Sequence, residues 1–452
     1  MKYEIPYGKQ KIAIDIPDIN IINFSDNKSG YSKLKGTDTA YKEAAGNKAA
    51  GEDASSGRTI VEKASGGKKI IEMDIAEKDI IENALLSPVA AKKLKDAAYM
   101  KKNVCILVSD ITRPCPSYKF LPFLIRDLKE ANVETIKIIF GLGIHRKHSR
   151  QEQIKLAGPE AADTCELIDF DRGRVKLIGT TSYGTPVEVF EDLVHSDFIL
   201  ATGNIEYHYF AGYSGGSKAL MPGLCSYNSV RANHSMMLEE MARSGEFTDN
   251  PVRKDIEEAG RIAGIDYIFN VILDDSKKII AAVAGKNNDA FIEGIKIYDS
   301  IYEISSDKKA DIVITSAGGY PKDINLYQAQ KALESVKDIV KDGGTIILTA
   351  ECPEGFGEDR FAEWMQGTRD FERLYEKIRN DFVLGGHKAV AVSKLLTRAG
   401  VILYSKFNEH ETYNMGFEKI DDVQGFIDEK LKQNKDLSVA VVPNGRFIKY
   451  CI

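Results

Sequence analysis

The chain has few cysteines, and their spacing argues against two common kinds of site. Six cysteines are scattered over 452 residues, and no two of them form a Cys-x-x-Cys pair. Structural zinc sites and the disulfide scaffolds of small secreted proteins both need closely spaced thiols. We therefore expect neither kind of site, and we expect the thiols to be reduced.

Long apolar runs and an excess of positive charge are also missing. The chain contains no run of about 18 apolar residues, the length that crosses a bilayer, and its beginning, MKYEIPYGKQ, holds no apolar signal core. The formal net charge is -6, which disfavours nucleic acid or an anionic membrane as the main partner. We expect a cytoplasmic protein that handles a small molecule.

The remaining composition is that of an ordinary globular protein with more than one domain. Hydrophobic residues make up 43% and charged residues 28% of the chain, whose 452 residues suit two or three domains. Residues 1–24 alternate apolar and polar as strands do, whereas residues 25–69 are rich in Gly, Ser, Ala, Lys and Asp. Such a composition buries too little apolar surface to offset ordering, so residues 25–69 are expected to form a mobile surface insertion without an assigned role.

From Ile70 onward the sequence alternates between strand-like and helical patterns. Buried parallel strands joined by helices give such a pattern, so the predicted fold class is α/β, with two αβ domains and an active-site cleft between them. We expect an N-terminal cofactor-binding domain over 1–287, a C-terminal αβ domain over 288–435, and strands over 436–452 that can return to the N-terminal domain. The apolar, β-branched runs are residues 103–110, 135–143, 197–205, 311–319 and 345–351.

Polar residues of the kinds used in catalysis follow the predicted strands, where ligands bind in open α/β sheets. Only seven histidines occur in the chain, and His145 and His208 both come after strands. A histidine pair suits general acid/base work because its ordinary pKa of about 6.5 lies near working pH, although a single histidine at such a place is more often a hydrogen-bonded loop residue. Asp110 and Arg113 could cap a helix and pair with each other instead of lining a site. The full set of strand-end candidates is Asp110, Thr112, Arg113, His145, Arg146, Glu206, His208, Lys322, Asp323, Gln328 and Lys331.

The most distinctive stretch is HYFAGYSGGSKALMPG, residues 208–223. Ser214, Gly215 and Gly216 come just before a single lysine, Lys218, and glycine lets the backbone approach a ligand closely. Such a loop suits a lysine held at a bound molecule, or a phosphate clamp. The P-loop spacing is absent, however, and no Gly-x-Gly-x-x-Gly motif follows a strand.

A helix is predicted to begin after Ser226 and to end at Gly245 as its C-cap. His234 lies on its apolar face and therefore points inward, as a satisfied core residue or as a metal ligand. The residues that share this face are Val230, His234, Met237, Leu238 and Met241.

Five blocks of this sequence resemble the nickel-dependent lactate racemase family and its wider set of 2-hydroxyacid racemase and epimerase homologues. The resemblance covers most of the chain outside residues 25–69. The blocks are SDITRP (109–114), GIHRKH (143–148), EYHYFAGYSGGSKALMPG (206–223), RANHSMM (231–237) and SAGGYPKDINLYQAQKAL (316–333).

The resemblance implies a nickel pincer nucleotide, a pyridinium ring bearing sulfur groups and joined to Lys218 as a thioamide. His234 is then the protein ligand of the nickel, which favours sulfur and imidazole donors. The implied reaction moves the C2 hydride of a 2-hydroxyacid to the cofactor and back to the opposite face, with His145 and His208 as the two bases. By the same resemblance Gln328 and Lys331 grip the substrate carboxylate, and the enzymes that make the cofactor are partners. The implied lining of the cofactor pocket is Asp110, Thr112, Arg113, Ser214, Gly215 and Gly216, with Arg113 also near the substrate.

The substrate stays open because one region departs from the lactate-specific members. Those members carry an aromatic residue over the substrate, whereas this chain has DFVLGGHKAV with His387, and its only tryptophan, Trp364, suits helix packing. Lactate, malate, hydroxyglutarate, an aromatic hydroxyacid or a sugar acid all remain candidates. Two other functions also remain: a metal-independent acid/base racemase or dehydratase, and a non-catalytic carrier of the pincer nucleotide. Nothing in the sequence fixes the oligomeric state.

Overall fold

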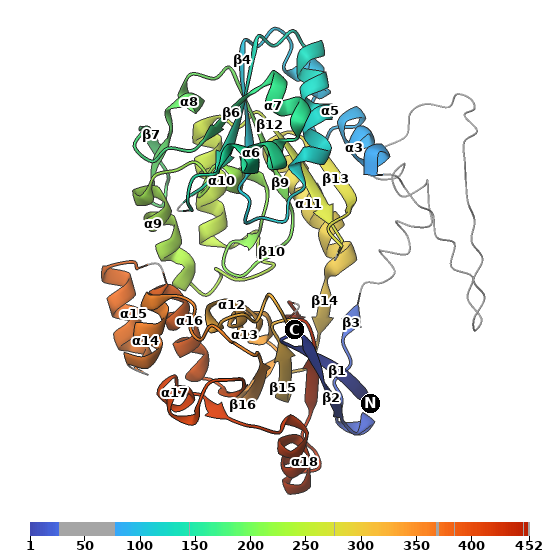
Figure 1. The fold of residues 1–452 in the computed structure, drawn as a ribbon, viewed down its shortest axis with the longest axis vertical. Coiled ribbons are helices and arrows are strands. Elements are labelled where there is room, and N and C mark those ends of the chain that lie inside the picture. The colour runs from blue at the N-terminus through green and yellow to red at the C-terminus, as the bar shows by residue number, and fades with distance from the viewer. Residues whose placement is uncertain are drawn as a thin grey trace, which may run out of the picture. The chain divides into compact units, whose positions relative to one another are not determined.

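The computed structural model describes residues 1–26, 77–143, 145–274, 276–367, 370–383, 385–445 and 447–450. The chain forms two compact units, Met1–Asp26 with Glu303–Ile452 and, between them in sequence, Asn27–Tyr302. We call these the terminal unit and the middle unit. Each contains a mostly parallel sheet with helices around it (Figure 1), which confirms the predicted α/β class. The predicted insertion, residues 25–69, lies outside the described residues except for Ser25 and Asp26.

The middle unit is built on a six-stranded sheet with the order β13-β12-β9-β4-β5-β6. All neighbours are parallel except β12 and β13, which are antiparallel. The apolar runs at 103–110, 135–143 and 197–205 are confirmed as strands, because a strand covered on both faces needs continuous apolar sequence. The strands are β4 (Asn103–Ser109), β5 (Thr135–Gly141), β6 (Glu166–Asp169), β9 (Phe198–Asn204), β12 (Tyr267–Leu273) and β13 (Ile279–Gly285).

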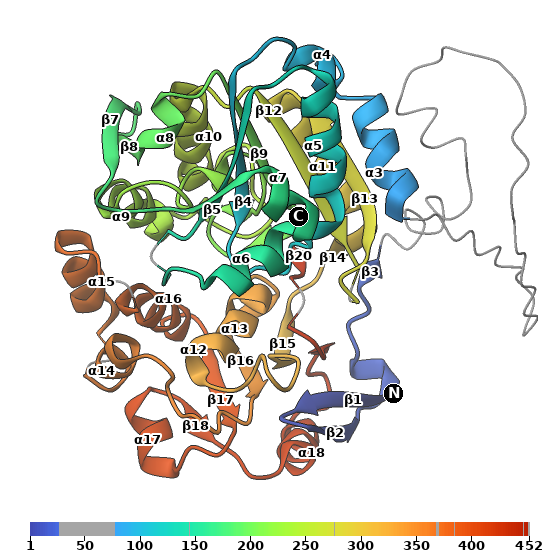
Figure 2. The same ribbon diagram turned by 45° about the horizontal axis from the view of Figure 1, so that its top comes forward.

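Helices and short hairpins complete the middle unit, and α3 and α11 lie beside β13 in both ribbon views (Figures 1 and 2). The helices are α3 (Glu77–Leu86), α4 (Leu94–Ala97), α5 (Ser117–Glu130), α6 (Arg150–Ala157), α7 (Pro159–Thr164), α8 (Glu191–Val194), α9 (Tyr227–Ser235), α10 (Pro251–Ala263) and α11 (Asn287–Tyr302), with short 3-10 turns η2 (Gly216–Ala219) and η3 (Met236–Leu238). The hairpins are β7 (Val175–Thr180) with β8 (Pro186–Phe190) and β10 (Tyr207–His208) with β11 (Gly212–Tyr213).

The terminal unit has a five-stranded sheet with the order β18-β17-β16-β15-β19, parallel throughout. Its strands are β15 (Ala310–Ser316), β16 (Val340–Thr349), β17 (Gly400–Tyr404), β18 (Glu418–Lys419) and β19 (Val439–Val442). A hairpin of β1 (Lys2–Tyr7) and β2 (Gln10–Asp15) and a small sheet of β3 (Ser25–Asp26), β14 (Ile304–Ser306) and β20 (Lys449–Tyr450) accompany it. The helices are η1 (Asp18–Asn20), α12 (Leu326–Ala329), α13 (Lys331–Val336), α14 (Asp359–Gly367), α15 (Phe371–Asn380), α16 (Gly386–Leu396), α17 (Glu409–Asn414) and α18 (Val423–Gln433).

The division into units differs from the predicted boundary at residue 287. Helix α11 packs on β12 and β13, and the Tyr302 hydroxyl donates a hydrogen bond to the Leu273 carbonyl oxygen at 2.6 Å, so the middle unit extends to Tyr302. The first residues of the chain belong to the terminal unit and not to the predicted N-terminal domain, because Ile5 and Ile14 of the β1–β2 hairpin are buried in the core of the terminal unit. The C-terminal strand β19 pairs with β15 instead of returning to the N-terminal domain.

The predicted helix from Ser226 to Gly245 is shorter than expected. Helix α9 ends at Ser235, the next residues tighten into η3, and Glu239 is extended. Gly245 has a φ of +72° and donates its N–H to the Gly212 carbonyl at 3.0 Å. It therefore belongs to a turn against β11, and His234 sits in the last turn of α9.

Candidate functional site

The backbone of the glycine loop is hydrogen-bonded to a fully buried arginine. Arg253 on α10 donates hydrogen bonds from Nη1 to the Tyr213 carbonyl and from Nη2 to the Gly215 carbonyl, both at 3.1 Å. Its Nη2 also lies 2.5 Å from Glu257 Oε1. The backbone ahead of Lys218 is therefore fixed by a paired, buried charge.

The two glycines of the loop are needed for packing inside the protein. Gly215 and Gly216 have φ values of +88° and +59°, a region that disfavours residues with a Cβ. A Cβ added at Gly216 would lie 2.8 Å from Arg253 Nη2, and the Gly216 N–H donates to Asn270 Oδ1 at 2.8 Å. Arg253 and Asn270 were not found from sequence, because neither belongs to a local pattern around the loop.

Lys218 and His234 are both driven toward their uncharged forms. Burial, and then the charges of Arg113 and Arg253, hold the pKa of Lys218 well below its usual value, although Glu206 acts in the opposite direction. Burial, followed by the nearby Lys218 charge, lowers the pKa of His234 to about 3. An uncharged amine is a nucleophile and a neutral imidazole offers a lone pair to a metal.

An aromatic side chain brings two of the predicted histidines to one place. The Phe210 ring centroid lies 4.7 Å from that of His208 and 4.9 Å from that of His234, in edge-on contacts. His208 Nδ1 accepts a hydrogen bond from the Ala211 N–H at 3.2 Å, which leaves the proton of the neutral ring on Nε2. Phe210, on the loop after β9, thus contacts both His208 and His234 of α9.

His145 is supported by the polar residues that follow β4. Its Nδ1 is hydrogen-bonded to Oδ2 of the buried Asp110, and Asp110 Oδ1 accepts from the Thr112 N–H at 2.9 Å and the Thr112 hydroxyl at 2.6 Å. Burial alone raises the pKa of Asp110, but the hydrogen bonds from His145 and Thr112 outweigh it, so the pKa is lowered. The ionised Asp110 therefore orients the half-exposed His145 ring. Thr112 and Arg113 are themselves exposed, and the Arg113 N–H donates to the Asp110 carbonyl at 3.1 Å.

A second histidine of the GIHRKH block was missed by the sequence analysis. His148 is almost fully buried, its Nδ1 pairs with Asp169 Oδ1 at 2.8 Å, and its Nε2 accepts from the Ile111 N–H at 3.2 Å. It fixes the segment next to Asp110 against the loop that carries His145. Its position three residues after His145 was the available signal.

Ser214, another predicted site residue, immediately precedes Gly215 in the glycine loop. It is partly buried, and its N–H donates to the Glu206 carbonyl at 2.8 Å. Every predicted site residue from Asp110 to His234 therefore lies in the middle unit, on the loops after β4, β5 and β9 or on α9.

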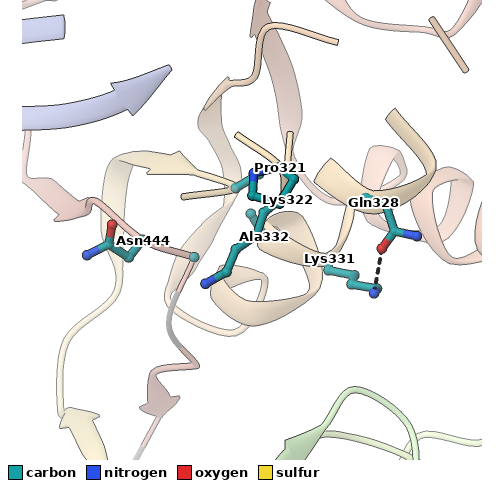
Figure 3. A pocket seen from close by; sticks show the side chains of 8 residues that line it. Pro321, Lys322, Gln328, Lys331, Ala332 and Asn444 are labelled. Atoms are coloured by element: carbon teal, nitrogen blue, oxygen red, sulfur yellow. Dashed lines mark hydrogen bonds between the residues drawn. The ribbon is translucent and has the colours of Figure 1, made fainter. Parts of the chain in front are cut away.

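The predicted carboxylate grip lies in the terminal unit. Lys331 Nζ donates to Gln328 Oε1 at 2.7 Å, and both side chains line a cavity of about 420 Å³ (Figure 3). Asn325 Oδ1 accepts from the Gln328 N–H at 3.1 Å and begins helix α12. The two side chains that the resemblance implies as the grip therefore lie together, and their role stays a prediction.

The region around His387 is packed inside the terminal unit. His387 is 3% exposed, its ring stacks on Phe382, and its Nδ1 accepts from the Gly385 N–H at 3.2 Å. Trp364 is also 3% exposed and packs against Gly386. Helix packing therefore accounts for Trp364.

Lys388, beside His387, is a second residue that the sequence analysis missed. It is 4% exposed, and its Nζ donates to the Tyr327 carbonyl at 2.8 Å and lies 3.4 Å from the centroid of the Tyr327 ring. Burial, and then the charge of Lys331, lowers its pKa to about 6. Lys388 thereby holds Tyr327, the residue that precedes Gln328, in place.

Comparisons with known proteins agree on one family. The family models described as the lactate racemase N-terminal domain and the lactate racemase C-terminal domain match residues 58–245 and 305–448. The lactate racemase of Thermoanaerobacterium thermosaccharolyticum is 32% identical over 458 residues, which cover 98% of this chain and 97% of that protein. The lactate racemase of Lactiplantibacillus plantarum is 35% identical over 288 residues, 62% of this chain and 67% of that protein.

Solved structures extend the similarity to the fold. The lactate racemase apoprotein from T. thermosaccharolyticum matches with a TM-score of 0.83 and 30% identity over 100% of both chains. A protein from Thermotoga maritima, 18% identical over 83% of this chain and 99% of its own, has a TM-score of 0.59 and shares the fold. No helix in the described part of the chain is long and apolar enough to span a membrane. The chain belongs to the lactate racemase family and is an isomerase of the racemase type.

Proposed function

We propose that this racemase inverts C2 of a 2-hydroxyacid with a nickel pincer nucleotide attached to Lys218 and with His234 as the nickel ligand. The observation that carries the proposal is that burial lowers the pKa of two side chains in the middle unit, the amine of Lys218 and the imidazole of His234, and so favours their neutral forms. We further propose that the protein works in the cytoplasm and receives its cofactor from the enzymes that make it. The five described cysteines are free thiols, which suits that compartment.

The residues present fit such a group. An uncharged Lys218 amine can form an amide-type bond, whereas an ammonium cannot. A neutral imidazole such as His234 suits nickel that is otherwise held by soft sulfur donors. When bound, the cofactor supplies a hydride acceptor for C2 of the substrate.

Proton transfer falls to the two other histidines. His145, oriented by Asp110, would take the hydroxyl proton of one enantiomer, and the Asp110 carboxylate would stabilise the resulting imidazolium. His208, whose tautomer is set by the Ala211 N–H, would serve the other enantiomer. Two bases are needed because inversion exchanges the two faces of the substrate.

Gln328 and Lys331 would bind the substrate carboxylate. A lysine ammonium and an amide together give a charge-assisted grip. Such a grip keeps the planar ketoacid in place between removal and return of the hydride. The assignment rests on their shared position at one cavity.

The test is to purify the chain after co-expression with the cofactor-making enzymes and to examine both the modification and the reaction. We expect a mass adduct on the Lys218 peptide, one nickel per chain, and equilibration of one enantiomer in a panel of D- and L-2-hydroxyacids followed by chiral chromatography. Lys218→Ala should lose the adduct and the nickel, whereas Lys254→Ala, at an exposed position on α10, should keep both.

The same experiment separates the two rival functions. Full activity of metal-free protein with unmodified Lys218 would contradict the proposal and favour a metal-independent acid/base racemase or dehydratase. Adduct and nickel without turnover of any hydroxyacid would favour a carrier of the cofactor.

A further inference from the structure

The short hairpin of β10 and β11 (Figure 1), which carries His208, is bonded on both strands to one carboxylate. Tyr207 on β10 pairs with Tyr213 on β11, and His208 and Gly212 form the next pair. The Tyr207 hydroxyl donates to Oδ1 of Asp299 on α11 at 3.0 Å, and the Tyr213 hydroxyl donates to Oδ2 at 2.8 Å and to Oδ1 at 3.0 Å. Asp299 therefore joins the two strands one residue away from His208.

Burial strengthens this contact. Tyr213 is 2% exposed. Burial, followed by the charge of Asp299, raises the pKa of Tyr207 far above its usual value, so its hydroxyl keeps the proton that it donates. Hydrogen bonds to a carboxylate are roughly twice as strong as those between neutral groups. The ring of Tyr298, also on α11, is edge-on to that of Tyr207, with centroids 4.9 Å apart. Helix α11 therefore holds the hairpin by hydrogen bonds and by packing.

Strand β11 is also fixed from another direction. The Tyr213 carbonyl accepts from Arg253 Nη1 at 3.1 Å. The Gly212 carbonyl accepts from the Gly245 N–H at 3.0 Å. Through its two tyrosine partners, Asp299 ties β10 to this anchored strand.

The ring of His208 depends on the geometry of the hairpin. Its Nδ1 accepts from the N–H of Ala211, which lies in the turn between β10 and β11. The hairpin has only two residues in each strand, and an isolated hairpin is marginally stable at best. The bond that sets the His208 tautomer is therefore kept by support from outside the hairpin.

We infer that Asp299 is a positioning residue for His208. It fixes the strand that carries the ring and thereby the Nδ1 bond to Ala211. The inference rests on the proposed function, in which His208 is one of two bases. Displacement of a catalytic group by about 1 Å can lower a rate by about 10²-fold, so the support of the hairpin has a direct effect on proton transfer.

The first test is kinetic and uses the cofactor-loaded enzyme. Asp299→Leu cannot accept from either tyrosine, so kcat should fall by about 10- to 100-fold with KM little changed. Asp299→Asn keeps a carbonyl oxygen that can accept from both hydroxyls and should restore most of kcat. Tyr207→Phe, which releases β10, should also lower kcat. Tyr302→Phe is the matched control, because it removes another tyrosine hydroxyl of α11, bonded to the Leu273 carbonyl, and should leave kcat unchanged.

The second test needs no cofactor. Nitrogen-15 NMR of histidine-labelled, full-length protein distinguishes which ring nitrogen of His208 carries the proton, and His208→Ala identifies the signal. Well above the ordinary histidine pKa of about 6.5, the wild type, Asp299→Asn and Tyr302→Phe should show the Nε2–H form alone. Asp299→Leu should show a mixture of both tautomers.

A single Nε2–H form together with wild-type kcat in Asp299→Leu would overturn the positioning role. Equal falls of kcat in Asp299→Leu, Asp299→Asn and Tyr302→Phe would overturn it too, because they would reflect general destabilisation. Failure of the proposed function looks different. Full activity of His208→Ala would remove His208 as a base, whereas a changed tautomer in Asp299→Leu would still support Asp299 as the residue that fixes the ring.

Discussion

The two groups of candidate site residues differ most in how far water reaches their lysines. Burial and the charges of Arg113 and Arg253 hold the pKa of Lys218 in the middle unit well below its usual value, whereas Lys322 and Lys331 at the cavity of the terminal unit are exposed. A desolvated amine suits formation of a covalent bond, and an exposed ammonium suits reversible binding of a carboxylate. The extent of burial thus decides which of these two chemistries a lysine side chain suits.

The largest expected effect concerns the bases of the middle unit. His145→Ala and His208→Ala should each lower kcat by about 10²–10⁴-fold, the usual contribution of general acid/base catalysis. The Lys218 adduct and the nickel should remain, as measured by mass spectrometry and metal analysis. His410→Ala, at an exposed histidine of α17, is the control. Loss of metal in either active-site variant would show that the histidine roles are exchanged.

A second prediction tests whether Gly216 in the glycine loop is required because a larger side chain would clash with its neighbours. Gly216→Ala should destabilise the protein by about 2–5 kcal/mol, because a positive φ costs about 1–2 kcal/mol and the clash with Arg253 adds about 1–3 kcal/mol. Gly184 also has a positive φ, +81°, but no atom lies within 4 Å of a Cβ added there. Gly184→Ala should therefore lose only the free energy that the positive φ costs. Urea unfolding followed by circular dichroism measures both. Equal losses in the two variants would contradict the packing argument.

The strands and the fold class could be predicted because they depend on local patterns, whereas the pairing of Gln328 with Lys331 was implied by the family resemblance. The apolar runs at 103–110 and 197–205 became β4 and β9 within a residue at each end. Polar residues at strand ends are brought to one edge by a parallel sheet, which is why Asp110 and His145 meet.

What could not be predicted depends on contacts between distant parts of the chain. Arg253 supports the glycine loop from a helix 38 residues after Gly215, and Gly8 anchors Asp323 across 315 residues. The glycines of the loop were interpreted as room for a ligand, yet the space at Gly216 is taken by Arg253 and Phe291. Composition and spacing carry no information on such partners.

In the terminal unit the exposed Lys331 should act through binding. Lys331→Met should raise KM by about tenfold or more, because a charge-assisted bond to the carboxylate is lost, and should change kcat less than His145→Ala does. Steady-state kinetics of the loaded enzyme with both enantiomers measures this split. A fall in kcat with an unaltered KM would place Lys331 among the groups that act in the chemical step.

Lys388 is an exception to the contrast between a buried lysine in the middle unit and exposed lysines in the terminal unit, because it is a buried lysine of the terminal unit. Its pKa falls from 10.5 to about 6 on folding, so between these values the unfolded chain holds a proton that the folded chain lacks. The free energy of unfolding should therefore rise with pH over this window, by at most about 1.4 kcal/mol per pH unit.

Urea unfolding from about pH 6.5 to about 7.5, below the ordinary titration of cysteine thiols, measures the effect, to which Lys218 adds a rise of the same sign. Trp364 fluorescence reports it, because this single tryptophan packs against the first turn of α16, which carries Lys388. Lys388→Met should lower the slope and leave the part that Lys218 contributes, whereas Lys394→Met, exposed on the same helix, should keep the whole rise. Lys331→Met should shrink the rise, since removing the neighbouring charge lets the pKa of Lys388 recover. A slope in Lys388→Met equal to that of the wild type would mean that burial does not neutralise this lysine, and the contrast between the lysines of the two units would then hold without exception.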